Sequence, residues 1–129
     1  MTHDEIINMP AGFEMDSLIA VSVLGMELVK NDGDAGGEFW IGNFGLTLGQ
    51  MPKRDLPQFS TDISAAWDVV EKFQGTAVRI TKAYGMGGVV YWVRIGDIDV
   101  CAPTAPLAIC RAAYLAMTVN ETGEHHAGI

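Results

Sequence analysis

The sequence is poor in the residues from which most metal and nucleophile centres are built. It contains two cysteines, Cys101 and Cys110, outside any C-x-x-C arrangement, and three histidines, all near the chain ends. The adjacent His125 and His126 lack the i, i+4 spacing and the third ligand of a zinc site. No serine, cysteine or lysine has a recognisable partner base, and no pair of carboxylates suited to acid–base chemistry is apparent. We therefore expect a protein that is not an enzyme and that binds no metal ion and no cofactor.

Long apolar runs are also missing. No run approaches the roughly 18–20 residues of a membrane span, and residues 1–5 are acidic where a signal peptide would be basic. Two cysteines without a pairing pattern suit free, buried thiols in a reducing compartment. The 129 residues fit one domain, 1–129, in which the polar residues 120–129 form a flexible tail. We expect a cytoplasmic protein without a membrane partner.

Positive charge is scarce but concentrated. The formal net charge of −8 argues against binding to nucleic acid or to an anionic membrane. Five of the eight basic residues nevertheless lie between positions 72 and 111, where only two acidic residues oppose them. A locally positive segment in an acidic protein suits a compact anionic ligand better than a long polyanion. The alternative is that these are ordinary solvated side chains.

Two short helices are predicted at the N-terminus. Thr2 and Glu5 have the spacing of a capping box. Pro10 interrupts this helix and suits the first turn of a second one, which runs to about Leu24 and ends at Gly25. The apolar residues of the second helix fall close to helical spacing and predict one buried stripe: Phe13, Leu18, Ile19 and Val23.

The pattern from 31 to 59 is poor, because six glycines and then two prolines interrupt it. We expect a long loop with at most one short strand, around 39–41 or 46–48. A loop of this length in a compact domain indicates a functional or partly mobile segment.

The clearest helix follows this loop. Residues 60–62 offer three candidate N-caps, and Gly75 can end the helix. Its apolar residues form a single stripe at helical spacing: Ile63, Ala66, Trp67, Val70 and Phe73.

Three strands and a last helix complete the chain. Residues 76–83 and 89–95 are rich in β-branched and aromatic residues, with a hairpin loop over 84–88. A turn leads into a third strand over 98–102, and a helix then runs from Pro103 to about Val119, capped by Thr104. This order predicts an α+β fold in which an antiparallel meander sheet is flanked by helices.

Two arginines stand out because they lie among apolar residues. Arg111 is the only charged residue in the last helix, and Arg94 lies within an apolar strand. Arg111 could snorkel to the surface, or it could pair with an aspartate or a phosphate. With nearby aromatic residues the two arginines could form a pocket that stacks a base and clamps phosphate. They could equally be edge arginines beside core aromatics. The candidate ligand-binding residues are Arg111, Arg94, Tyr84, Arg79, Trp92 and Thr104.

Two segments resemble a known family. The sequences at 60–72 (STDISAAWDVVEK) and 102–113 (APTAPLAICRAA) are similar to the two characteristic helices of the phage ABA-sandwich domain proteins, and residues 11–19 resemble the opening of that family. The resemblance covers most of the chain. It implies phage or prophage origin and an ABA sandwich of helices packed on a sheet. The glycine-rich 31–59 segment departs from the compact connection expected there.

The resemblance also suggests a relation to Thoeris anti-defence proteins. Those phage oligomers sequester cyclic ADP-ribose-type immune signals, and some hold cyclic oligonucleotides, without cleaving them. Carried over to this chain, the idea assigns a phosphate to Arg111 in the matching second helix, with Arg94 and Tyr84 in the less similar hairpin. The expected partner is thus a small cyclic nucleotide in the cytoplasm of the infected host. The alternatives are a phage protein-interaction module without a small-molecule ligand and, more remotely, a nucleotide hydrolase.

A homo-oligomer is expected as well. The apolar N-terminal and C-terminal helices together exceed what a three-stranded sheet can cover, which predicts interfaces lined by these helices.

Overall fold

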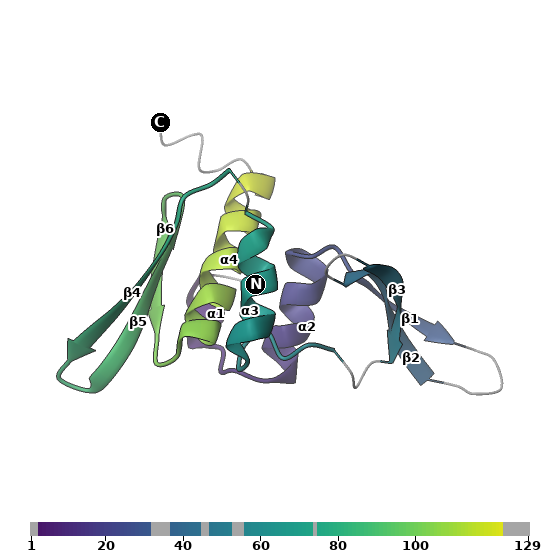
Figure 1. Cartoon of the computed structure of the whole chain (residues 1–129), viewed down its shortest axis with the longest axis horizontal. Coiled ribbons are helices and arrows are strands. Elements are labelled where there is room, and N and C mark those ends of the chain that lie inside the picture. Colours follow the sequence, from purple (N-terminus) through teal and green to yellow (C-terminus); the bar gives the residue numbers. More distant parts are fainter. Residues whose placement is uncertain (1–2, 32–36, 45–46, 53–55, 74, 123–129) are drawn as a thin grey trace.

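The computed structural model describes residues 3–31, 37–44, 47–52, 56–73 and 75–122. The helices are α1 (His3–Asn8), α2 (Phe13–Ser22), α3 (Ile63–Glu71) and α4 (Ala105–Thr122). The strands are β1 (Glu27–Asn31), β2 (Gly37–Phe44), β3 (Thr47–Pro52), β4 (Val78–Gly85), β5 (Gly88–Ile95) and β6 (Ile98–Ala102). Figure 1 shows the helices in the centre, with β4–β5–β6 on one side and β1–β2–β3 on the other.

The expected meander sheet is present. Strands β4, β5 and β6 pair antiparallel in sequence order, and α4 packs against β5 and β6. The hairpin loop expected over 84–88 is shorter than that, because Gly85 and Gly88 pair with each other and leave only Met86 and Gly87 in the turn. The α+β class and the antiparallel meander are therefore confirmed.

The prediction of a long loop over 31–59 is wrong. Residues 27–52 contain three antiparallel strands in the order β1–β2–β3. Two of the glycines taken as loop signals, Gly42 and Gly49, lie opposite each other in the β2–β3 register. Pro52 ends β3, at the edge of this sheet, where a missing backbone donor is tolerated. Glycine weakens a strand without forbidding it, so cross-strand pairing overrides the local signal.

The core lies between the helices and sheet β4–β5–β6. Ile19, Val69, Val93 and Ile109 are fully buried there, one from each of α2, α3, β5 and α4. Every residue of α4 from Leu107 to Ala116 is buried except Arg111, because this helix packs against α1, α2, α3, β5 and β6. α4 is one of the helices expected to line an oligomer interface. It therefore buries its apolar face within the chain itself.

Local signals place the starts of α3 and α4 correctly. Asp62 is the N-cap of α3, and its Oδ1 accepts a hydrogen bond from the Ser64 amide at 3.0 Å. α4 begins directly after Thr104, and the Ala108 amide donates to the Thr104 carbonyl. α4 ends later than expected, at Thr122, so 120–122 are helical and only 123–129 of the expected tail lie outside the described residues. Thr2, of the expected capping box, also lies outside them.

Both predicted apolar stripes contain exposed residues. Phe13 at the start of α2 is 46 % exposed, and on α3 Ile63 and Trp67 are 43 % and 49 % exposed. The buried side of α3 instead consists of Ala65, Ala66 and Val69. None of the described helices is long and apolar enough to cross a membrane.

Candidate functional site

Sheet β4–β5–β6 has two faces, and they separate the candidate residues. Side chains alternate between the faces along each strand. Arg79 and Arg94 are paired across β4 and β5, Asp99 pairs with Arg94 from β6, and all three are exposed on the outer face, away from the helices. Trp92 lies on the same face and is 42 % exposed. Three of the six candidates are thus neighbours.

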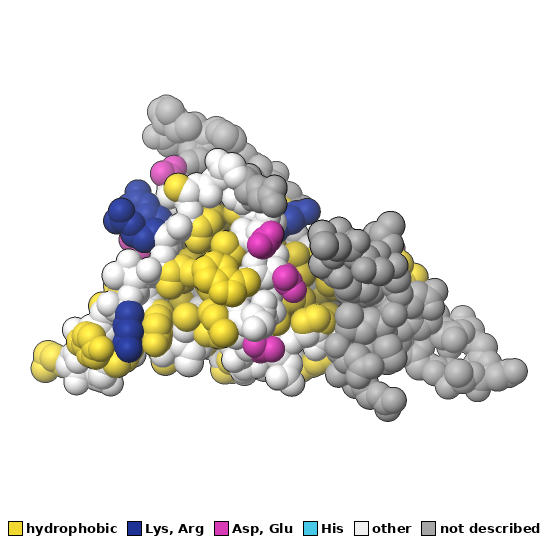
Figure 2. Space-filling model, viewed as in Figure 1, with side chains coloured by type: hydrophobic (Ala, Val, Ile, Leu, Met, Phe, Trp, Pro, Cys, Tyr) yellow, Lys and Arg dark blue, Asp and Glu magenta, His cyan; other side chains and the backbone are white. Residues whose placement is uncertain are grey.

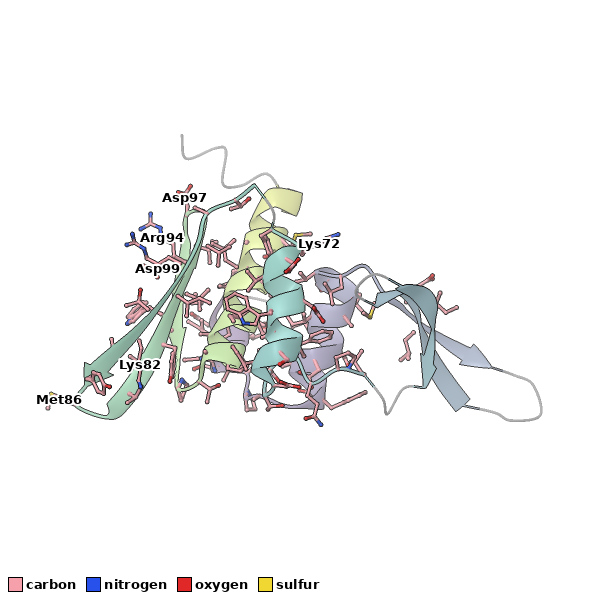
Figure 3. All side chains as sticks on the ribbon, viewed as in Figure 1. Lys72, Lys82, Met86, Arg94, Asp97 and Asp99 are labelled. Atoms are coloured by element: carbon pink, nitrogen blue, oxygen red, sulfur yellow. The ribbon has the colours of Figure 1, made fainter. Side chains whose placement is uncertain are left out.

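Acidic side chains lie near the arginines of the outer face. Arg94 Nε donates a hydrogen bond to the Gly96 carbonyl at 3.2 Å. Figure 3 shows Arg94 beside Asp97 and Asp99, at the end of the sheet far from the Met86 turn. Opposite charges nearby reduce the attraction that these guanidinium groups offer to an anion.

Arg111 donates hydrogen bonds to the backbone of two other parts of the fold. Its Nη1 donates to the Cys101 carbonyl at 3.2 Å, and its Nη2 donates to the Met9 carbonyl at 3.0 Å. Burial lowers the pKa of Arg111 from its ordinary value, and the nearby Cys101 opposes this shift. The guanidinium therefore ties α4 to β6 and to the α1–α2 connection.

An open hollow of about 480 Å³ lies between the inner face of the hairpin, the N-terminus of α3 and the start of α4. Its lining residues are Ile63, Lys82, Val89, Tyr91, Pro103, Thr104, Ala105 and Pro106. Thr104 is the one sequence candidate among them. The first turn of a helix carries amide groups without partners inside the helix and the positive end of the helix dipole. The start of α4 therefore brings positive potential to the hollow, although Pro106 itself has no amide hydrogen.

Lys82 is the only charged residue in this lining. Its Nζ lies over the ring of Tyr84, 5.6 Å from the ring centre. Tyr84 is 77 % exposed, so this contact leaves the ammonium group accessible. The candidate Tyr84 thus adjoins the hollow through Lys82.

Lys82, Tyr91 and Val89 line the hollow but were not among the candidates from the sequence. A signal was available in the two-residue period of a strand, which places Lys82 and Tyr84 on one face of β4 and Val89 and Tyr91 on one face of β5. The hairpin register then puts Lys82 opposite Tyr91 and Tyr84 opposite Val89. Arg79 and Arg94 lie at alternate strand positions to these residues, and their side chains are therefore on the outer face of the sheet.

The cysteines behave as expected of free thiols. Cys110 is buried in α4, and Cys101 is partly buried in β6. Burial raises the pKa of the Cys110 thiol, and the nearby Asp16 raises it further, so the thiol stays protonated. No group of three or more histidine, cysteine or acidic residues that could hold a metal ion occurs within the described ranges.

Comparisons with known proteins agree with the fold. A solved phage protein from Bacillus cereus ATCC 14579 is 27 % identical, with a TM-score of 0.53, over 83 % of this chain and 92 % of that one. No curated protein matches. The family model of the phage ABA sandwich domain matches residues 17–114, which include both helices that carried the resemblance. The chain therefore belongs to the phage ABA sandwich domain family.

Proposed function

We propose that this phage protein binds a small cyclic nucleotide signal in the hollow and sequesters it without cleaving it. The observation that carries the proposal is the placement of Lys82, the only charged lining residue, in one hollow with the start of α4. A cation and a helix N-terminus together attract a phosphate group. The resemblance to Thoeris anti-defence proteins supports a cyclic ADP-ribose-type or cyclic oligonucleotide ligand. The site of action would be the cytoplasm of the infected host.

The remaining lining suits the rest of a nucleotide. Tyr91 offers an aromatic surface for a base, and Val89 and Ile63 provide apolar contacts. The Thr104 hydroxyl can donate to a phosphate or accept from a ribose hydroxyl. These groups supply contacts and charge, which is what a sequestering protein requires.

Lys82→Ala tests the binding site. Removing a charge-assisted contact worth about 1.5–3 kcal/mol should weaken binding by at least about tenfold. Isothermal titration with cyclic ADP-ribose and with a cyclic dinucleotide measures the change. Lys82 is exposed, so the melting temperature should stay nearly constant.

Arg94→Ala is the matched control, because it removes the same charge from the outer face of the same sheet. Binding should persist in this variant. The opposite pattern, lost binding in Arg94→Ala and intact binding in Lys82→Ala, would move the ligand to the outer face.

Release of bound nucleotide tests sequestration. The protein is incubated with the nucleotide and denatured, and the released molecule is identified by mass spectrometry. Intact nucleotide is the expected result. An altered nucleotide would mean a hydrolase, and no retained nucleotide would favour an interaction module.

A further inference from the structure

One edge of sheet β4–β5–β6 has no neighbouring strand. β4 is eight residues long, lies at the end of the strand order, and pairs only with β5 among the described strands. Among the described elements, β5 is also the only one that packs extensively against β4. An edge strand of this length presents a row of backbone amide and carbonyl groups with which another extended chain can pair. We define the β4 edge as the row formed by the backbone of Val78–Gly85.

The register of the hairpin identifies the backbone groups of the β4 edge. Gly85 and Gly88 flank a two-residue turn, and the residues that flank such a turn exchange backbone hydrogen bonds. Hydrogen-bonded pairs then recur at every second residue, so the amide and carbonyl of Thr81 point toward β5. Those of Val78 and Ile80, at the alternate positions, point away from β5. The β4 edge therefore offers both donors and acceptors to an added strand.

The opposite edge of the sheet is occupied by a side chain of the protein itself. β6 lies at that edge, and the Cys101 carbonyl accepts a hydrogen bond from Arg111 Nη1 at 3.2 Å. A strand added to β6 would have to displace this guanidinium group. The β4 edge is therefore the one that favours strand addition.

The charges next to the β4 edge favour an acidic segment. Across the outer face, Arg79 is paired with Arg94, and Arg94 is paired with Asp99. The aspartate therefore lies on the far side of Arg94, whereas Arg79 has an arginine on one side and the β4 edge on the other. Like charges directly opposite each other are destabilising, and opposite charges are stabilising. A carboxylate beyond Arg79 would balance this row.

The charge of β4 argues against a second β4 strand at this edge. β4 contains Arg79 and Lys82 and no acidic residue, so two paired β4 strands would bring basic side chains close together. Figure 2 shows basic side chains along the side of the molecule formed by sheet β4–β5–β6, whereas acidic side chains lie over α3. The net charge is −8, but repulsion from acidic groups more than about 8 Å away is largely screened at physiological ionic strength.

We propose that the β4 edge binds an extended segment of another protein, which pairs antiparallel with β4 and places an acidic side chain beside Arg79. Backbone hydrogen bonds supply the affinity in this mode of binding, and alternate side chains supply the specificity. Ile80 is partly buried and packs against the core, so a β-branched residue beside it would extend the apolar inner face. The inference does not rest on the proposed function, because it uses the backbone of β4 and the Arg79 side chain.

A fluorescein-labelled peptide tests the choice of an acidic segment by fluorescence anisotropy. It alternates valine and threonine over about seven residues, within the usual range of strand lengths, with glutamate in place of the threonine that faces Arg79. This peptide should bind saturably, and a peptide with lysine instead of glutamate should bind at least about threefold more weakly. Arg79→Glu, shown to be folded by circular dichroism, should reverse this order. No binding, or the same order in both proteins, would overturn the proposal.

N-methylation of the peptide tests backbone pairing. Methyl groups on the valines that face Ile80 and Lys82 remove donors directed at β4, and binding should weaken at least about tenfold. The matched control carries its methyl groups on the threonines, whose amides point away from β4, and it should bind like the unmodified peptide. Equal weakening of the two methylated peptides would contradict strand addition.

Amide hydrogen exchange tests whether the β4 edge is free before the peptide is added. The Ile80 amide should exchange faster than the Thr81 amide, which the register directs at β5, and the peptide should slow the exchange of Ile80. Slow exchange at Ile80 in the protein alone would mean that a second copy of the chain already covers the edge. That result, or slowing by the peptide at β6 instead of β4, would overturn the proposal.

Discussion

Arg111→Ala is expected to lower the free energy of unfolding by about 2–4 kcal/mol, because charge-assisted hydrogen bonds are worth about 1.5–3 kcal/mol and unsatisfied carbonyls carry a penalty. The guanidinium donates to the Cys101 and Met9 carbonyls, and alanine would leave both without this donor. The two contacts join α4 to β6 and to the α1–α2 connection, so their loss affects three parts of the fold. Urea unfolding followed by circular dichroism measures the change.

Two variants separate the structural role of Arg111 from its expected role in phosphate binding. Arg111→Lys should recover only part of the stability, because an ammonium group cannot reproduce the planar fork that reaches both carbonyls. Arg94→Ala, on the exposed outer face, should change stability by less than about 0.5 kcal/mol. If Arg111→Ala instead keeps its stability and loses nucleotide binding, the phosphate role expected from the sequence is correct.

The C-terminal half of the fold could be predicted because its signals are local. β4, β5 and β6 have alternating or β-branched sequences with short turns, and α3 has both an apolar stripe and the cap Asp62. The helix α4 starts at Ala105, within the Pro103–Pro106 segment, as the helix-start signals indicate. Each of these elements is specified by residues within about ten positions, so sequence reasoning identifies it.

The sheet at 27–52 could not be predicted because its signals are not local. Gly42 opposes Gly49, and Gly37 opposes Asn31, so residues of poor strand propensity pair with one another. Only the register reveals that these positions face each other and leave the better strand formers, such as Trp40, to pair with Leu28 and Met51. Propensity in a sheet depends on such cross-strand neighbours, which a single sequence does not show.

The candidate residues could be named from the sequence by type, but their neighbours could not. An arginine surrounded by apolar residues could serve a ligand or the fold, and the sequence left both open for Arg111. The sequence could not show that Arg111 has a hydrogen-bond partner 102 positions away, the Met9 carbonyl. Lys82 did not stand out because a single lysine in a strand resembles any solvated side chain. Its position becomes distinctive only through the start of α4, which lines the same hollow.

A second large effect is expected at a buried polar contact between α2 and the segment before α3. Asp16 is buried, and its Oδ1 accepts from the Ser60 hydroxyl at 2.7 Å and from the Ser60 amide at 2.8 Å. The Ser60 hydroxyl oxygen also accepts from the Gly12 amide at 2.9 Å. Ser60→Ala removes this hydroxyl and should lower the free energy of unfolding by about 1.5–3 kcal/mol near pH 7, the range for hydrogen bonds to charged groups.

This loss should depend on pH. Burial raises the pKa of Asp16 above its ordinary value of 3.8, and the hydrogen bonds from Ser60 lower it in part. A carboxyl group whose pKa is higher in the folded state makes the protein less stable as pH rises from 3.8 through the folded-state pKa. Without the hydroxyl the folded-state pKa rises further, so the decline extends to higher pH. The destabilisation by Ser60→Ala is therefore larger at pH 7 than at pH 3.5.

Urea unfolding of the wild type and of Ser60→Ala at pH 3.5 and pH 7 measures both effects. Ser17→Ala is the matched control on α2, because the Ser17 hydroxyl is buried and has no hydrogen-bond partner among the described residues. Replacing a hydroxyl without a partner should change stability by less than about 0.5 kcal/mol at either pH or increase it slightly. If Ser60→Ala were equally destabilising at both pH values, the Asp16 carboxylate would not be coupled to Ser60, and the contact would contribute through packing alone.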